Sequence, residues 1–455
     1  MPRRHAAWNP TSMRTSAIFS STLLALGLLC NASAHATPVL LISIDGLRPG
    51  EILEADSRGL RIPTLRRLLA GGAHATDVHG VLPTVTYPSH TTLLTGVAPA
   101  QHGIVSNLTF DPLIKNQQGW YWYAEDIRVP TLWDAARAAR LVTANVHWPV
   151  SVGARVDYNL PQIWRTGTPD DRKLVRALSS PGLLDALEHD LGAYTDGIDE
   201  TIEGDETRGR FAVRIIQNYH PAFMTAYFTA LDHTQHGYGP DTPQAHDVLE
   251  RIDGVVAKLI EAARASEPDT LVAIVSDHGF APLQHDVNLA DAFVKAGLVH
   301  FDKKGKVDAW QAEPWYSGGS AAIVLKDPHD EDLRKRVRAL LDTIARQPAN
   351  GVERILTRDE IARQAGNPQA EFYVLFKPGF EMAPDLTLPM VGPSVMRGMH
   401  GYDVDLPQMR STFLIEGHGV PAGKSLGSID MRDIAPTLAR LLGVALPDAQ
   451  GKPLL

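Results

Sequence analysis

Cysteine is almost absent from this sequence. The only one among 455 residues is Cys30, and it lies in an N-terminal segment that differs in composition from the rest. If that segment is removed, the remaining chain can form no disulfide and offers no thiolate to a metal ion. This composition favours a bacterial periplasmic or secreted enzyme over an animal extracellular protein, because the latter class is usually stabilised by disulfides.

Long basic runs are also missing. The sequence has 43 Lys and Arg against 52 Asp and Glu, a net charge of −9. Residues 1–36 hold three Arg and no acidic residue, so the rest of the chain has 40 basic and 52 acidic residues. Such a chain is a poor candidate for binding long nucleic acid. A small anionic substrate held by metal ions is compatible with this charge.

The N-terminal apolar run, "AIFSSTLLALGLLC", is short of the roughly 20 residues that span a membrane. Three arginines precede it and the small residues "NASAHA" follow it, an order typical of a secretory signal peptide. We predict a signal peptide over residues 1–36, cleaved after Ala36 or, as a second choice, after Ala34. A single membrane anchor is the alternative. The prediction is therefore a periplasmic or secreted protein without a stable membrane anchor.

Strand and helix patterns alternate along the remaining chain. The segment Pro38–Gly50, "PVLLISIDGLRPG", begins as a continuous apolar strand and stops at Asp45-Gly46. Further strands are predicted in "LVTANVHWP", "PAFMTAYFTALDH", "DTLVAIVSDHGF" and "STFLIEG", with helices in "RIPTLRRLLAGG", "VPTLWDAARAAR" and "MRDIAPTLARLLG". This alternation predicts an α/β sandwich with a central, mostly parallel sheet flanked by helices.

The stretch Val81–Gly96, "VLPTVTYPSHTTLLTG", carries six Ser and Thr residues just ahead of a helical pattern. Ser and Thr are ordinary residues at helix starts, so caps and turns account for them without any chemistry. One of them could instead be a nucleophile. The stretch alone leaves both interpretations open.

Four separate segments place acids or imidazoles where strands are predicted to end. In α/β sheets, ligands bind at the carboxyl ends of strands, so such side chains can converge on one site. Each segment has an ordinary structural explanation as a turn, a surface pair or a core histidine, but four together make coincidence less credible. The residues are Asp45, Asp232, His236, Asp277, His278 and His400.

Carboxylate oxygens and neutral imidazoles are suitable ligands for zinc, and six of them supply three for each of two ions. Two metals about 4 Å apart can hold the entering and leaving oxygens of a phosphoryl displacement. A structural zinc site would be closed by four protein ligands. Three ligands per metal therefore favour a catalytic pair over a zinc-stabilised binding or adhesion protein.

Taken in order, the motifs resemble those of one enzyme family. "SIDGLR", "PTVTYPSHTTLLTG" with "HGIVSN", "LDHTQHGYGP", "SDHG" and "MHGYD" are similar to the nucleotide pyrophosphatase/phosphodiesterase family, in its bacterial type. This family belongs to the alkaline phosphatase superfamily, so the resemblance implies an alkaline-phosphatase-like sandwich. It covers nearly the whole chain after residue 38.

The resemblance also implies roles for individual residues. Thr86 matches the nucleophile, and Asn107 matches the amide that donates to a nonbridging phosphoryl oxygen. Tyr87 and Tyr227 match the two aromatic positions that hold the nucleobase, although both also fit core aromatics. The implied metal ligands are Asp45, Asp277 and His278, with Thr86, on one zinc, and Asp232, His236 and His400 on the other.

The implied activity is hydrolysis of phosphodiester or pyrophosphate bonds of nucleotides through a covalent nucleotidyl-threonine, which releases nucleoside 5′-monophosphates. The alternative is a phosphodiesterase or phosphatase acting on lipid or choline headgroups or on simple phosphate esters. Val85 stands where many animal members have lysine, and Ser89 replaces a frequent asparagine. These differences leave the preferred nucleotide open, and the oligomeric state is open as well.

We predict that residues 37–455 form a single catalytic domain. The stretch from about 282 to 397 has mixed patterns and many charges. It is predicted as a cap on, or an insertion into, that domain.

Overall fold

The structure is a computed structural model that describes residues 37–116, 119–383 and 389–455. The predicted signal peptide lies outside the described residues, so its existence and its cleavage site stay predictions. Within the described part of the chain, no helix is both long and apolar enough to cross a membrane.

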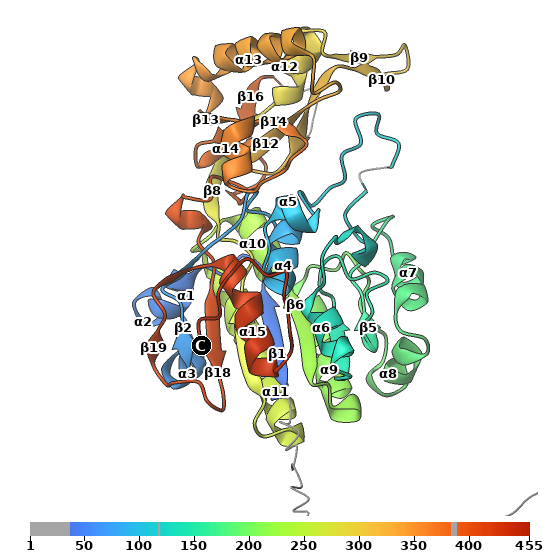
Figure 1. Cartoon of the computed structure of the whole chain (residues 1–455), viewed down its shortest axis with the longest axis vertical. Coiled ribbons are helices and arrows are strands. Elements are labelled where there is room, and N and C mark those ends of the chain that lie inside the picture. Colours follow the sequence, from blue (N-terminus) through green and yellow to red (C-terminus); the bar gives the residue numbers. More distant parts are fainter. Residues whose placement is uncertain (1–36, 117–118, 384–388) are drawn as a thin grey trace, which may run out of the picture. The chain divides into compact units, whose positions relative to one another are not determined.

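An eight-stranded sheet in the order β19-β2-β18-β7-β1-β6-β4-β5 forms the centre of the fold (Figure 1). Only β18 runs antiparallel to its neighbours. The predicted α/β fold with a central, mostly parallel sheet is therefore confirmed. Its strands are β1 (Val39–Ile44), β2 (Ala73–His74), β4 (Thr143–Val146), β5 (Tyr158–Leu160), β6 (Phe223–Phe228), β7 (Leu271–Val275), β18 (Phe413–Glu416) and β19 (Lys424–Ser425).

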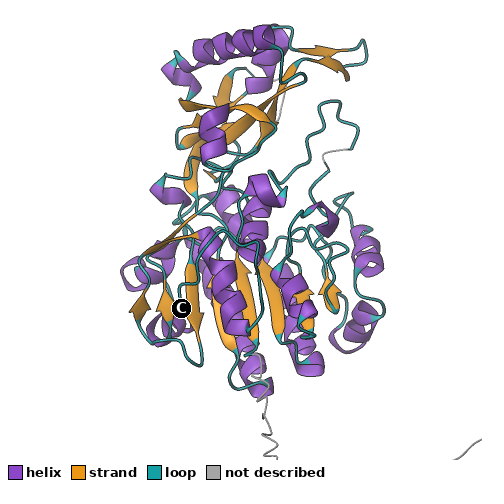
Figure 2. Cartoon of the chain, in the orientation of Figure 1, coloured by secondary structure: helices purple, strands orange, loops and turns teal. Residues whose placement is uncertain are grey.

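Strand β1 is buried on both faces, as its continuous apolar run predicts. Leu40 and Ile42 belong to a hydrophobic cluster with residues of α9 and α11, whereas Leu41 belongs to a second cluster with residues of α4 and α15. Figure 2 shows the helices that cover the sheet. The main ones are α3 (Pro63–Gly71), α4 (Thr86–Thr95), α6 (Leu132–Ala138), α9 (Ile202–Tyr219), α11 (Pro243–Ser266) and α15 (Ile434–Leu442).

Shorter elements connect these layers. They are α1 (Pro49–Leu53), α2 (Ala55–Arg58), β3 (Asp77–His79), α5 (Pro99–His102), η1 (Ala124–Asp126), α7 (Asp171–Leu178), α8 (Leu183–Leu191), α10 (Ala230–Tyr238), η3 (Pro407–Met409), β20 (Ser428–Asp430) and η4 (Met431–Asp433).

Residues 281–383 and 389–399 build sheets separate from the central one, around a hydrophobic cluster of their own. One sheet has the order β11-β12-β14-β13, and β8 pairs with β15, β16 and β17. The elements are β8 (Ala281–Val287), α12 (Leu289–Lys295), β9 (Val299–Phe301), β10 (Val307–Trp310), β11 (Ala312–Tyr316), β12 (Ser320–Leu325), α13 (Glu331–Ala345), η2 (Pro348–Asn350), β13 (Val352–Thr357), α14 (Arg358–Arg363), β14 (Ala370–Phe376), β15 (Gly379–Met382), β16 (Val391–Pro393) and β17 (Gly398–Met399). The division of the chain into a catalytic domain and an insertion stays a prediction.

One local expectation is wrong. The pattern "PAFMTAYFTALDH" predicts a strand that ends in Asp232, but β6 ends at Phe228 and Asp232 lies in the first turn of α10. The carboxylate of Asp205 accepts hydrogen bonds from the backbone N–H groups of Thr229 and Ala230, at 3.2 and 2.8 Å. This carboxylate caps the start of α10 from a distant part of the chain, which the local pattern does not reveal.

Candidate active site

Two of the acidic segments follow directly from neighbouring parallel strands. Asp45 comes after β1, and Asp277 with His278 comes just after β7, which pairs with β1. The third segment lies on α10, where Asp232 and His236 are one helical turn apart and therefore share a face. His400 follows β17, which pairs with β8 rather than with the central sheet.

The first predicted ligand group comes together in the structure. Ligand atoms of Asp45, Asp277 and His278 lie within 4.8 Å of one another. The Nε2 atom of His278 is 3.4 Å from Oδ1 of Asp45 and 3.1 Å from Oδ2 of Asp277. Thr86 is also in place, because its Oγ1 is 3.4 Å from the same Nε2 atom.

The second group is centred on Asp232. Nε2 of His236 is 3.3 Å from one of its carboxylate oxygens, and Nε2 of His400 is 3.7 Å from the other. His278 lies close to this group as well, since Asp232, His278 and His400 also meet the 4.8 Å limit and the rings of His278 and His400 stack at 3.7 Å. All six predicted ligands thus converge, with His278 between the two groups.

The three histidines present the same nitrogen to the site. Nδ1 of His236 faces the carbonyl of Gly398 at 3.0 Å, Nδ1 of His278 faces its neighbour's carbonyl at 3.1 Å, and Nδ1 of His400 faces the Thr84 carbonyl at 3.2 Å. A carbonyl oxygen only accepts, so each Nδ1 carries the proton and donates it. When such a ring is neutral, the lone pair of Nε2 faces the carboxylates, the arrangement that metal-binding histidines adopt.

Three carboxylates of the site each have one buried oxygen without a hydrogen-bond partner. Oδ1 of Asp45, Oδ1 of Asp232 and Oδ2 of Asp277 have no hydrogen-bond partner within the described chain. Burial raises the pKa of Asp45 well above its usual range, and the charges of Asp232 and Asp277 raise it further. Burial and then His278 lower the pKa of His400 to about 3. Unpaired buried carboxylate oxygens beside imidazole lone pairs are a donor set that fits divalent cations.

Thr86 is the first residue of α4, whose N-cap is Val85. Four of the other five hydroxyls bond to backbone carbonyls or to His102, whereas Oγ of Ser89 is buried without a hydrogen-bond partner in the described chain. Thr84 donates to the Tyr402 carbonyl at 2.8 Å, Thr91 donates to the Tyr87 carbonyl at 2.8 Å, and Thr95 donates to the Thr91 carbonyl at 2.7 Å. Thr86 is therefore the hydroxyl of this stretch that faces the acidic groups.

Asn107 is held at the same helix start. Its Oδ1 accepts a hydrogen bond from the backbone N–H of Tyr87 at 2.8 Å. A backbone N–H requires an acceptor, so this contact identifies the oxygen and leaves the NH₂ group as the donor available to the pocket that Asn107 lines.

A pocket of about 520 Å³ opens beside these residues, and Thr86, Tyr87, Asn107 and Tyr227 all line it. Tyr87 packs against Trp120, with ring centroids 5.2 Å apart, and Trp120 packs against Trp164 at 5.0 Å. Both tryptophans also line the pocket and are only half-buried. The sequence analysis missed them, because nothing in the local pattern brings "QGWYW" and "PQIWR" to the same wall.

Tyr227 is as buried as Tyr87, at 2% and 1% exposure, but its contacts differ. Its hydroxyl donates to Asp45, and its ring packs against His90 at a centroid distance of 4.5 Å. These contacts give Tyr227 a role in holding Asp45. Its predicted stacking on a nucleobase remains a prediction, and Trp164 is an alternative ring for that role.

A buried glycine couples the two ligand groups. The N–H of Gly46, directly after Asp45, donates to Oδ1 of Asp277 at 3.2 Å, and its carbonyl accepts from Nε2 of Gln235 at 3.0 Å. Gln235 lies on α10 between the predicted ligands Asp232 and His236. The backbone of one residue, Gly46, therefore connects ligands of both groups.

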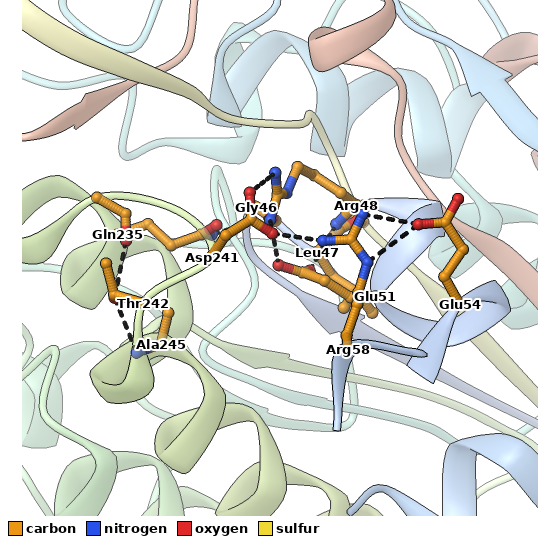
Figure 3. Close-up of polar contacts among 12 residues, drawn as sticks. Gly46, Leu47, Arg48, Glu51, Glu54, Arg58, Gln235, Asp241, Thr242 and Ala245 are labelled. Atoms are coloured by element: carbon orange, nitrogen blue, oxygen red, sulfur yellow. Dashed lines mark hydrogen bonds and ion pairs between the residues drawn. The ribbon is translucent and has the colours of Figure 1, made fainter. Parts of the chain in front are cut away.

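Ion pairs extend this connection toward the surface (Figure 3). Arg48 binds both carboxylate oxygens of Asp241, at 2.9 and 2.7 Å, and also Glu51 at 2.9 Å. Asp241 precedes α11, so the pairs tie the loop after Asp45 to the loop after α10. A bidentate guanidinium–carboxylate pair has a defined geometry, which suits such a tether.

Gly46→Ala is predicted to disturb both ligand groups. Gly46 has φ +68°, and an added Cβ would lie 2.9 Å from Nε2 of Gln235 and 3.0 Å from the Phe280 ring. Gly59, with φ +71° and nothing within 4 Å, is a matched control. We expect Gly59→Ala to cost about 1–2 kcal/mol of unfolding free energy, the penalty of a left-handed conformation.

Gly46→Ala should exceed this cost by about 1–3 kcal/mol, the range for overpacking, and should lower the metal content. Denaturant unfolding and elemental analysis of both variants test this. Equal stability and equal metal content of the two variants would contradict the proposed coupling.

The sequence of the chain identifies its family. Residues 39–403 match the model of the type I phosphodiesterase / nucleotide pyrophosphatase family. The chain belongs to this family. It is therefore a phosphodiesterase/nucleotide pyrophosphatase-family hydrolase, which confirms the predicted class of enzyme. The bacterial type within the family remains a prediction.

The chain is distantly similar in sequence to several proteins of this family. An uncharacterized pyrophosphatase/phosphodiesterase of Schizosaccharomyces pombe is 25% identical over 429 residues, which are 89% of this chain and 76% of the yeast protein. Human ectonucleotide pyrophosphatase/phosphodiesterase family member 1 is 24% identical over 265 residues, which are 55% of this chain. The chain spans only 24% of the length of that human protein.

Solved structures of the family share the fold. Human ectonucleotide pyrophosphatase/phosphodiesterase 5 aligns with a TM-score of 0.66 and 19% identity, over 91% of this chain and 97% of the human chain. The murine protein of the same name, solved as an inactive threonine-to-alanine variant in complex with AMP, aligns with a TM-score of 0.64 and 20% identity, over the same shares of the two chains.

Proposed function

We propose that the protein hydrolyses phosphodiester or pyrophosphate bonds of nucleotides and releases nucleoside 5′-monophosphates through a covalent intermediate on Thr86. One observation carries the proposal: the Thr86 hydroxyl lies at a helix start, beside two converging Asp/His groups and at the wall of a pocket lined by aromatic rings. Each feature matches one requirement of nucleotide cleavage. The hydroxyl is the nucleophile, the Asp/His groups hold the metal ions that neutralise the phosphate charge, and the aromatic rings contact the base.

We propose two Zn²⁺ ions as the cofactor, one held by Asp45, Asp277 and His278 and the other by Asp232, His236 and His400. Asp and His are ordinary ligands of zinc in catalytic sites. When bound, the ions would lower the pKa of the Thr86 hydroxyl and neutralise charge on the reacting oxygens.

The chain's own residues then perform the displacement. Thr86 Oγ1 forms a bond to phosphorus in line with the leaving oxygen, whose bond to phosphorus breaks. Water later adds to the same phosphorus, and the bond to Thr86 breaks. The NH₂ group of Asn107 and the backbone N–H of Thr86 donate to the nonbridging oxygens, which carry the developing charge.

The aromatic side chains support a nucleotide over a simple ester. Tyr87, Trp120 and Trp164 form one wall of the pocket next to Thr86. The solved complex of the murine relative contains AMP, and its inactive threonine-to-alanine variant is consistent with an essential threonine in that protein.

A substrate panel on the purified, zinc-loaded protein tests the proposal. Nucleotide diesters and pyrophosphates should be cleaved much faster than lysophospholipids or simple monoesters. Removing an aromatic ring should then weaken nucleotide turnover about ten- to a hundredfold, because stacking on a base is worth roughly 1–3 kcal/mol. We expect this loss for Tyr87→Ala and for Trp164→Ala, mostly in KM.

Bis-nitrophenyl phosphate, which lacks a base, should be affected little by either change. Tyr87→Phe is the matched control, because it keeps the ring and loses only the hydroxyl that donates to Gln162 at 2.8 Å. Tyr227→Ala, measured alongside, decides whether that ring also contacts the base. If the variants slow both substrates equally, the rings are structural and the nucleotide proposal loses its main support.

One observation favours the lipid alternative. Val395, Met396 and Ile198 line the same pocket, and all three are exposed, Val395 to 87%. Exposed apolar side chains at a pocket mouth suit an acyl chain. Preferential cleavage of lysophospholipids in the panel would select this function. Export to the periplasm or the medium belongs to the proposal and rests on the N-terminal sequence alone.

A further inference from the structure

A buried histidine, His90, lies on α4 one helical turn after Thr86. Its side chain is fully buried, and no step of the proposed reaction uses it. Because helical side chains lean toward the N-terminus, the ring reaches back to the first turn. Its Nδ1 is 2.8 Å from the Thr86 carbonyl, and its Nε2 is 2.8 Å from Oγ of Ser43 on β1. The rings of Tyr227 and Trp148 pack against it at centroid distances of 4.5 and 4.8 Å. The imidazole therefore connects the start of α4 to the central sheet in a fixed orientation.

The two hydrogen bonds of His90 have opposite directions. A carbonyl oxygen only accepts, so Nδ1 carries a proton and donates it to the Thr86 carbonyl. Burial lowers the pKa of His90, although the charge of Asp277 acts against this shift. The ring is therefore neutral, and its Nε2 accepts from the Ser43 hydroxyl.

The peptide group between Thr86 and Tyr87 is held from both sides. Its carbonyl accepts from Nδ1 of His90 at 2.8 Å, and its N–H donates to Oδ1 of Asn107 at 2.8 Å. A peptide group is planar and includes the Cα atom of the preceding residue, so two contacts on its opposite ends fix that Cα as well. The Thr86 hydroxyl is two bonds from this Cα. The contacts therefore determine where Oγ1 lies relative to Nε2 of His278, which is 3.4 Å away.

We propose that His90 is a positioning residue for the first displacement, because its hydrogen bond to the Thr86 carbonyl holds the nucleophile in line with phosphorus. The inference rests on the proposed function, in which Thr86 attacks phosphorus. An attacking atom has to lie about 3–3.5 Å from its target with aligned orbitals, and a misplacement of about 1 Å can lower the rate about a hundredfold. A buried donor on the Thr86 peptide restricts this displacement before any substrate binds.

The competing explanation is a histidine that only packs and hydrogen-bonds in the core. His102 has such an environment, because it is also fully buried. Its Nε2 lies 3.1 Å from Oγ1 of Thr92, and its Nδ1 accepts from the Ile104 N–H at 3.1 Å. Neither partner is among the residues that line the Thr86 pocket. His102→Leu is therefore the matched control for the loss of a buried histidine.

Three variants of His90 separate its two hydrogen bonds. His90→Asn places an amide nitrogen near the position of Nδ1 and can still donate to the Thr86 carbonyl. His90→Gln reaches the position of Nε2 and can still pair with the Ser43 hydroxyl. His90→Leu keeps much of the side-chain volume and makes neither bond. If His90→Leu does not fold, His90→Gln tests the loss of the Thr86 contact alone.

Single-turnover release of nitrophenolate from a nitrophenyl-nucleotide ester measures the first displacement directly. His90→Leu and His90→Gln should slow this release about a hundredfold. Their KM and their metal content should stay close to those of the wild type, because the pocket wall and the six predicted ligands are intact. His90→Asn should recover most of the rate, and His102→Leu should keep it even where its Tm falls.

Two kinetic results would overturn the proposal and leave the proposed function intact. One is a rate of His90→Leu equal to that of His102→Leu, and the other is equal rates of His90→Asn and His90→Gln. A loss of metal that accounts for the lost rate of His90→Leu would overturn it too. The ring would then act through Asp277, whose Oδ2 is 3.5 Å from Nδ1 of His90.

Crystal structures of the wild type, His90→Leu and His90→Asn test the positioning without any turnover. Oγ1 of Thr86 should move away from Nε2 of His278 in His90→Leu and should keep its place in His90→Asn. An unmoved Thr86 in His90→Leu overturns the proposal. If the wild type cleaves no nucleotide ester, the proposed function fails, and these structures alone decide whether His90 positions Thr86.

Discussion

Thr86→Ala is expected to lower the turnover of a nitrophenyl-nucleotide ester by at least about a thousandfold, because no other hydroxyl can take the place of the nucleophile. Thr86 is the first residue of α4, and its Oγ1 lies 3.4 Å from Nε2 of His278. Asp45, Asp277 and His278 would still hold the nearby ion in this variant, so the fold and the metal content should stay nearly unchanged. Steady-state kinetics, circular dichroism and elemental analysis of the same preparation measure the turnover, the fold and the metal content in turn.

Two further variants sharpen this test. Thr86→Ser keeps a primary hydroxyl at the same position and should retain part of the activity. Thr95→Ala, on the same helix, removes a hydroxyl that donates to the Thr91 carbonyl and accepts from the Val97 N–H, and it should keep nearly full activity. A Thr86→Ala protein with most of the wild-type rate would refute the nucleophile assignment.

Replacing any of the six predicted ligands should remove a metal ion together with most of the activity. Asp45→Ala and Asp277→Ala should lose the ion near Thr86, whereas Asp232→Ala and His236→Ala should lose the other, because removing one ligand of three severely weakens a site. His400→Ala should lose the same ion as Asp232→Ala and His236→Ala. His278→Ala should have the widest effect, since His278 lies between the two groups.

Elemental analysis of the six proteins after dialysis gives the number of ions per chain. His233→Ala is the matched control, because His233 neighbours Asp232 on α10 but pairs with Glu200 at 3.2 Å, so both ions should remain. Adding Zn²⁺ to metal-free wild type should raise its Tm, as any ligand that binds only the folded state does. Two ions in all six variants would disprove the ligand assignment.

The sequence predicted those parts of the site that depend on local patterns. Apolar runs that end in Asp45 and Asp277 identify strand ends, and a parallel sheet brings such ends to one edge. The Ser and Thr residues after Val85 predict a helix start, and α4 begins there. In each case the information lies within a dozen consecutive residues.

The remaining features depend on contacts between distant segments. Asp205 caps α10 from α9, and Trp164 reaches the wall beside Tyr87 only after the chain has folded. The hydroxyl of Tyr227 is engaged by Asp45, a residue 182 positions away. Periodicity predicts which element a residue belongs to. It contains no information about which side chain of another element that residue will contact.

The peptide of Gly46 has a consequence for how the protein folds. It contacts Asp277 across 231 positions, and the ring of His400 contacts the Thr84 carbonyl across 316. Closing such long loops costs chain entropy before any contact compensates for it, and folds dominated by distant contacts form slowly. We therefore expect the cation-binding groups to assemble late, so that a chain caught midway through refolding has formed helices but cannot yet retain its ions.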